Sequence, residues 1–280
     1  MMAQLIDRKQ LKADMKTLLR TAQVSPRAMT ALYLGIILAL DLADTAAGGS
    51  MLYGGNLPGT FVSVLAGLIG MVLSAGFTLY CMAVRRGERA EFLTLFDGFS
   101  FVGKVIGLNI VIGVFTALWS MLFVIPGIIA AYRYRFALYN LYEDPAMGIM
   151  EALEMSKRQT MGYKTQLFLL DLSYFGWSLL AAAPAVVLEW CVSYQAVQAA
   201  FAAPTPAGIA SLLALAPVGW ILLIDLWSLA VSLFYLAAYQ CTELGYFETA
   251  KSTSGVGLGA KPPKPDSPWG SAGPDGLGGL

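Results

Sequence analysis

The feature that most constrains this chain is a series of long apolar runs separated by short polar stretches. Runs near residues 28–47, 60–84, 165–188 and 215–240 are each about 20 residues long or more, and a helix of about 20 residues crosses the ~30 Å hydrocarbon core of a bilayer. Only 13% of the 280 residues are charged, against roughly 25% in soluble domains. We therefore expect an all-α fold, a polytopic transmembrane helical bundle.

A further apolar run, residues 105–142, is too long for one span and about right for two. Pro126 and Gly127 interrupt it. Proline removes a helical hydrogen-bond donor and glycine permits a tight turn. We therefore divide the run into spans 105–125 and 127–142 with a hinge or turn at Pro126 and Gly127, which gives six spans in all.

The positive charges indicate how these spans are oriented. Of the 18 lysines and arginines, six precede the first span, four lie in 85–104, three in 143–164 and three after residue 250. The expected outer loops, 48–59 and 189–207, contain none. Cytoplasmic loops carry the excess of Lys and Arg, so both termini are expected in the cytoplasm. Without a crossing at 127–142, the basic residues of 157–164 would lie outside.

Three polar segments are expected on the cytoplasmic side. Residues 1–27 contain a basic amphipathic helix whose apolar positions recur on one face, at Leu11, Met15, Leu18 and Ala22. This helix either lies on the inner membrane surface or packs against the mouth of the bundle. Residues 144–162 form an amphipathic connector, and the Gly/Pro-rich tail 251–280 is expected to be disordered.

Ionisable side chains inside the predicted spans need an explanation, because each costs roughly 2.5–3.5 kcal/mol on insertion scales. The candidates are Asp41, Asp44, Arg133, Arg135, Asp171, Glu189 and Asp225. Counting along ideal helices places Asp41, Arg133 and Asp225 at a similar level, about 10 Å below the outer edge of the core. We therefore expect an intramembrane polar site in which Arg133 pairs with Asp225, Asp41 or both.

Three further residues are secondary candidates for that site. Arg135 lies about 200° around the helix from Arg133 and should face another partner or the membrane surface. Asp171 and Ser173 lie nearer the cytoplasmic side, where they could contact the 144–162 connector. Such charges either fix helix packing or line a polar cavity that binds a headgroup, ion or small solute.

Several phrases of the sequence resemble a known family. They are Ile125-Pro126-Gly127 with Tyr132-Arg133-Tyr134, Glu151-Ala152-Leu153 with Ser156-Lys157, and Leu170-Asp171-Leu172-Ser173 with Gly176-Trp177. Over about residues 5–248 the chain resembles the bacterial integral membrane proteins called domain of unknown function 975. The resemblance implies six helices and a bacterial inner membrane, and it supplies no activity.

The residue types present favour a binding role over catalysis. Histidine is absent, and the sequence contains no metal-ligand cluster and no nucleotide-binding loop, so we expect no enzyme activity, no cofactor and no metal. A net charge of zero gives no indication of nucleic acid. Two roles stay open. The first is binding or transport of an anionic lipid or small solute through a polar intramembrane site. The second is a non-catalytic accessory or scaffold protein that docks cytoplasmic or membrane partners.

Overall fold

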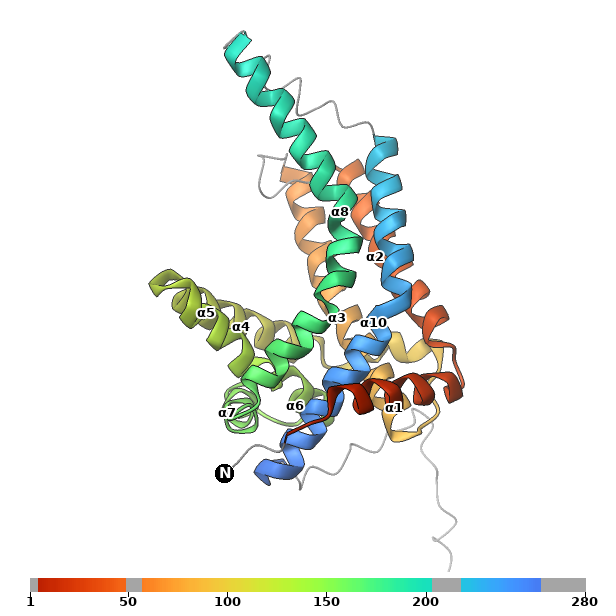
Figure 1. Cartoon of the computed structure of the whole chain (residues 1–280), viewed down its shortest axis with the longest axis vertical. Coiled ribbons are helices and arrows are strands. Elements are labelled where there is room, and N and C mark those ends of the chain that lie inside the picture. The colour runs from red at the N-terminus through yellow and green to blue at the C-terminus, as the bar shows by residue number, and fades with distance from the viewer. Residues whose placement is uncertain (1–4, 49–56, 203–217, 258–280) are drawn as a thin grey trace, which may run out of the picture.

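The computed structural model describes residues 5–48, 57–202 and 218–257, and within these ranges every regular element is a helix (Figure 1). In chain order the elements are α1 (Arg8–Thr21), α2 (Pro26–Ala46), α3 (Leu57–Arg86), the 3-10 helix η1 (Phe92–Phe101), α4 (Val102–Leu122), α5 (Val124–Tyr134), α6 (Ala137–Glu143), α7 (Ile149–Gln159), α8 (Lys164–Ala202) and α10 (Val218–Ser254). The all-α fold predicted from the sequence is confirmed.

Five helical segments are long and apolar enough to cross a membrane: Pro26–Ala46, Leu57–Arg86, Phe92–Leu122, Lys164–Leu188 and Leu223–Ser254. This chain is therefore a membrane protein. Four of them, in α2, α3, α8 and α10, run side by side along the long axis of the molecule (Figure 1). α4 and α5 instead project sideways from the lower part of this bundle.

The structure corrects the expected fourth span. Residues 127–142 are not one helix, because α5 ends at Tyr134 and α6 begins at Ala137. The two helices contain 11 and 7 residues, and neither reaches the ~20 residues of a spanning helix. The two helices are separated by a turn at Arg135 and Phe136, where the ψ of Phe136, −2°, departs from the α-helical value of about −42°.

The turn between α4 and α5 lies three residues before the predicted one. Phe123, with extended backbone at φ −160° and ψ 151°, is the single residue between the two helices. Pro126 is the third residue of α5, where a missing N–H breaks no intrahelical bond. Gly127 makes a close contact with α4, since a Cβ at this position would overlap Ser120.

The segment after α3 folds back onto it through two glycines. A Cβ on Gly76 would overlap the carbonyl of Leu95, and one on Gly98 would lie 2.6 Å from the carbonyl oxygen of Val72. The capping box between Glu91 and Thr94 starts η1 at this place. η1 is therefore held against α3 and fixes where α4 begins.

One end of the bundle is covered by α1, α6 and α7. α1 packs against α10 and α3 through the buried Met15. Of the two positions expected for the N-terminal helix, the membrane surface and the mouth of the bundle, the structure shows the second. Arg85 at the end of α3 donates to the carbonyl of Cys241 at 2.9 Å and pairs with Glu248. We call this end, where the basic segments gather, the α1 face.

The last two long helices continue beyond their predicted spans. α8 extends through the expected outer loop to Ala202. α10 extends to Ser254, into the segment expected to be a disordered tail, and Lys251 bonds there to Glu143 at 2.5 Å. The remainder of that tail, 258–280, lies outside the described residues.

Candidate functional site

Arg135, at the joint between α5 and α6, is the centre of a charged cluster that connects three helices. Its Nη1 lies 2.6 Å from Oδ2 of Asp171 on α8, and its Nε lies 2.6 Å from Oε1 of Glu243 on α10. The Nη2 completes a bidentate pair with each carboxylate, at 3.0 and 3.1 Å. Paired two-point contacts of this kind are the strongest that a guanidinium makes.

Two tyrosines complete the Arg135 cluster. Tyr132 donates to Oδ2 of Asp171 at 2.6 Å, and Tyr239 donates to Oδ1 of the same carboxylate at 2.8 Å. The guanidinium also lies over the ring of Tyr132. The side chain of Glu243 is 4% exposed. Each charge in this cluster thus has a partner within the protein, which makes the cluster an internal brace between α5, α8 and α10.

The predicted site at Asp41, Arg133 and Asp225 is only partly assembled. Arg133 is exposed, and its carbonyl accepts from Ser156 at 2.9 Å and Thr160 at 3.3 Å. Asp41 and Asp225 lie on the adjacent helices α2 and α10. The structure therefore places the two acids on neighbouring helices, and Arg133 is exposed on α5.

The acids of α2 and α10 make few contacts with donors. Asp44 accepts from Ser63 at 2.5 Å. Oδ2 of Asp225 is buried and has no hydrogen-bond partner among the described residues. The side chain of Glu189, another sequence candidate, is not among the described ones.

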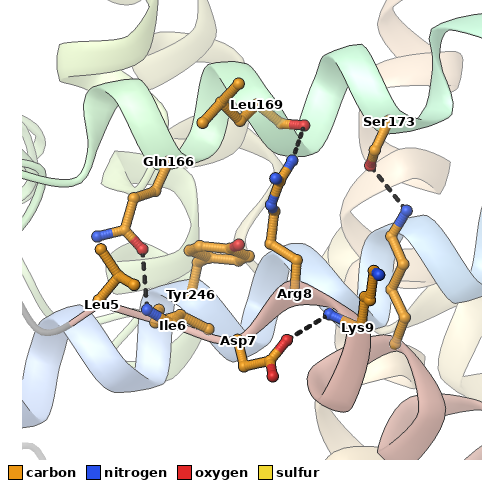
Figure 2. A pocket seen from close by; sticks show the side chains of 10 residues that line it. Leu5, Ile6, Asp7, Arg8, Lys9, Gln166, Leu169, Ser173 and Tyr246 are labelled. Carbon is orange, nitrogen blue, oxygen red and sulfur yellow. Dashed lines mark hydrogen bonds between the residues drawn. The ribbon is translucent and has the colours of Figure 1, made fainter.

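A second polar region is a cavity of about 630 Å³ between the start of α1 and the first turns of α8. Figure 2 shows the segment before α1 running beside α8 and in front of α10, with the ring of Tyr246 between this segment and α8. Ten residues line the cavity: Leu5, Ile6, Asp7, Arg8, Lys9, Lys12, Gln166, Leu169, Ser173 and Tyr246.

Three hydrogen bonds attach α1 to α8 around this cavity. Ile6 N donates to Oε1 of Gln166 at 3.2 Å, and Arg8 Nη1 donates to the carbonyl of Leu169 at 3.0 Å. Lys12 Nζ donates to Oγ of Ser173 at 2.7 Å. Ser173, predicted as a partner of the connector, thus contacts the N-terminal helix.

The cavity is electropositive. Arg8, Lys9 and Lys12 line it together with a single acid, Asp7, whose carboxylate caps α1 by accepting from Lys9 N at 2.9 Å. Partial burial and the positive charge of Arg8 lower the pKa of Lys12. A lowered lysine pKa means that the ammonium form is disfavoured here, so an anion in the cavity would offset that cost.

Tyr246 supplies the unusual feature of the cavity wall. Its side chain is fully buried, and its hydroxyl has no hydrogen-bond partner among the described residues. Leaving a buried hydroxyl without a partner costs about 1–3 kcal/mol. Arg8 and Asp7 line the same cavity as Tyr246.

Sequence reasoning missed Glu243, Tyr239 and the whole cavity. Tyr239 and Glu243 are four residues apart, which places them on one helical face beside Asp171. This spacing of four residues is the sequence signal from which the pair could have been predicted. In the described part of the chain, no three metal-ligating side chains gather where they could hold a metal ion.

Comparison with known proteins identifies a similar family. A family model described as "Protein of unknown function (DUF975)" matches residues 121–201, which include Arg135, Asp171 and Ser173. The chain is thus similar to that family from the last residues of α4 through α5, α6, α7 and nearly all of α8. No curated protein and no solved structure matches the chain.

Proposed function

We propose that this membrane protein binds an anionic phosphate-type headgroup in the cavity between α1 and α8. The observation that carries the proposal is the buried hydroxyl of Tyr246, which has no partner in the described chain and borders a cavity with three cationic side chains. Phosphate oxygens accept hydrogen bonds from hydroxyl, ammonium and guanidinium groups, and their negative charge matches this lining.

The location of the cavity supports a lipid as the source of that headgroup. Gln166, Leu169 and Ser173 belong to the first turns of a membrane-crossing segment, whereas α1 is polar and lies across the end of the bundle (Figure 1). Headgroups of a bilayer lie at this boundary between apolar and polar helix. Five of the 18 basic residues precede α2, and Arg27 lies in its first turn, which supports the cytoplasmic leaflet of a bacterial inner membrane as the place of binding.

The test is retention of a defined lipid by the purified protein. The full chain in mild detergent is given dioleoylphosphatidylglycerol or dioleoylphosphatidylcholine, and bound lipid is counted by native mass spectrometry. We expect the anionic lipid to be retained and the zwitterionic one to be lost. Competition by glycerol 3-phosphate would assign the site to a free phosphate solute, and no competition would assign it to a lipid.

Lys12→Ala and Lys16→Ala form a matched pair for the same measurement. Both remove one positive charge from α1, but Lys16 is exposed and does not line the cavity. A hydrogen bond to a charged group contributes roughly 1.5–3 kcal/mol, so Lys12→Ala should weaken retention about tenfold or more. Equal retention in the two variants would refute the site and favour an accessory role for the protein.

A further inference from the structure

α4 and α5 form the least covered part of the molecule. At the tip of this hairpin Phe123 is 73% and Ile125 70% exposed. Residues 105–132 contain no charged side chain. An uncharged surface of this size requires an apolar environment, and the question is how the hairpin enters the bilayer.

Both ends of the hairpin lie on the α1 face. Lys104 in the first turn of α4 donates to the carbonyls of Pro145 and Met147, at 2.5 and 3.2 Å. Glu143 at the end of α6 bonds to Arg86, the last residue of α3, at 2.8 Å. The chain therefore leaves this face along α4 and is back at it by the end of α6.

The return path is too short for a full crossing. Arg135 marks the depth at which α5 ends, and it is bonded to Glu243 of α10. Measured from Arg135, the 11 residues of α5 extend about 16 Å. This length is about half the thickness of the ~30 Å hydrocarbon core. From the same level α10 continues from Thr242 up to Val218, about 37 Å.

The hairpin also fails to cover the bundle beside it. α5 contacts α8 near its own end, where the Tyr132 ring lies 6.4 Å from that of Phe168. Farther along α8, Phe175 is 59% exposed. In Figure 1 the hairpin slopes away from the bundle, and its tip stays well below the far end of α8.

Two polar side chains of the hairpin bond to carbonyls of their own helix, whereas the buried Oγ1 of Thr116 has no partner among the described residues. Ser120 donates to the carbonyl of Thr116 at 2.8 Å, and Asn109 donates to that of Val105 at 2.9 Å. Pro126 lies in the first turn of α5, where backbone N–H groups lack intrahelical partners, and it has no N–H to satisfy. Apolar surroundings demand this kind of internal pairing.

We infer that α4 and α5 form a hairpin that enters the bilayer and returns to the same face, embedded in one leaflet. The chain then crosses the membrane four times, through α2, α3, α8 and α10. All of its clusters of basic residues stay on one face, as the positive-inside rule requires.

The test is the accessibility of single cysteines to a membrane-impermeant maleimide in sealed right-side-out and inside-out vesicles. Phe123→Cys reports the tip in a Cys191→Ser background. The native Cys191, exposed on α8 and 20 residues beyond Asp171, reports the far face. Glu88→Cys in the same Cys191→Ser background, at an exposed position after α3, reports the α1 face. Cys81 and Cys241 are buried and remain.

We expect Phe123→Cys to label from neither side until detergent is added. A bimane attached there should be quenched more strongly by nitroxides on lipid chains than by soluble iodide. Labelling from the same side as Cys191 would overturn the inference in favour of six crossings. Labelling from the same side as Glu88→Cys would place the hairpin on the surface and overturn it as well. Val124→Cys, 72% exposed in the wild type, provides a second tip position if the first variant misfolds.

Discussion

The Arg135 cluster and the cavity under α1 lie on opposite sides of the same turn of α8. Asp171 faces Arg135, and two residues later Ser173 faces Lys12. In the cluster, each charged group is bonded within the chain. In the cavity, cations outnumber acids and one buried hydroxyl has no described partner. A polar group that is satisfied internally holds the fold together, whereas an unsatisfied one is available to a ligand.

The largest effect expected from this comparison is that of Arg135→Ala. The substitution leaves the carboxylates of Asp171 and Glu243 without their counterion, which should cost about 3–5 kcal/mol of stability. Thermal unfolding in detergent, followed by size-exclusion chromatography after heating, measures the loss. Arg133→Ala is the matched control, since this neighbouring arginine is exposed and its change should stay within about 0.5 kcal/mol. Similar losses in both variants would contradict the assignment of Arg135 as a brace.

Tyr246→Phe should separate stability from binding. Removing a buried hydroxyl without a partner should leave the unfolding temperature unchanged or raise it. If that hydroxyl donates to a bound headgroup, retention of phosphatidylglycerol should fall roughly fivefold, the equivalent of about 1 kcal/mol. A variant that binds the lipid as well as the wild type would remove Tyr246 from the site, and a strongly destabilised one would show that its hydroxyl has a structural partner.

The smallest effect expected is a pH dependence of lipid retention. Burial and Arg8 lower the pKa of Lys12 below its usual 10.5. The ammonium form exists below that pKa, so retention should be constant near neutral pH and fall as pH rises through the lowered value. Measuring retention between about pH 7 and 10.5 tests this. Lys12→Arg should abolish the loss of lipid retention at high pH, because arginine stays charged throughout. An equal loss in that variant would show that a group other than Lys12 causes the pH dependence.

Hydropathy predicted the helices of the bundle well. In lipid, the backbone N–H and C=O groups of each span must be hydrogen-bonded within that span, so each apolar run forms a helix independently of its neighbours. α2 and α3 begin and end within three residues of the predicted spans 28–47 and 60–84. The end of α10 was missed, since its last turns are stabilised by tertiary contacts such as Lys251 to Glu143. No local pattern reports a contact between residues 108 positions apart.

The site was harder to predict, because depth was counted along an ideal straight helix. That count treats residues 127–142 as one rod and favours Arg133 over Arg135. In the structure Arg135, at the turn between α5 and α6, faces Asp171 and Glu243, and Arg133 is exposed. The basic residues of α1 were predicted as one polar face of an amphipathic helix. Their convergence with Tyr246 depends on how α1 packs against α8 and α10, which sequence periodicity does not contain.

The order of synthesis gives the Arg135 cluster a further consequence. Asp171 is made after Arg135 and about 70 residues before Glu243, so the pair precedes Glu243 by about 4–14 s at roughly 5–20 residues per second. During that interval the guanidinium has only one of its two carboxylates. α10 contacts α1, α2, α3, α7 and α8, so the last helix to be made is also the one that joins the others. A nascent chain stopped before Glu243 would hold an incomplete bundle in which Arg135 lacks one of its two carboxylate partners.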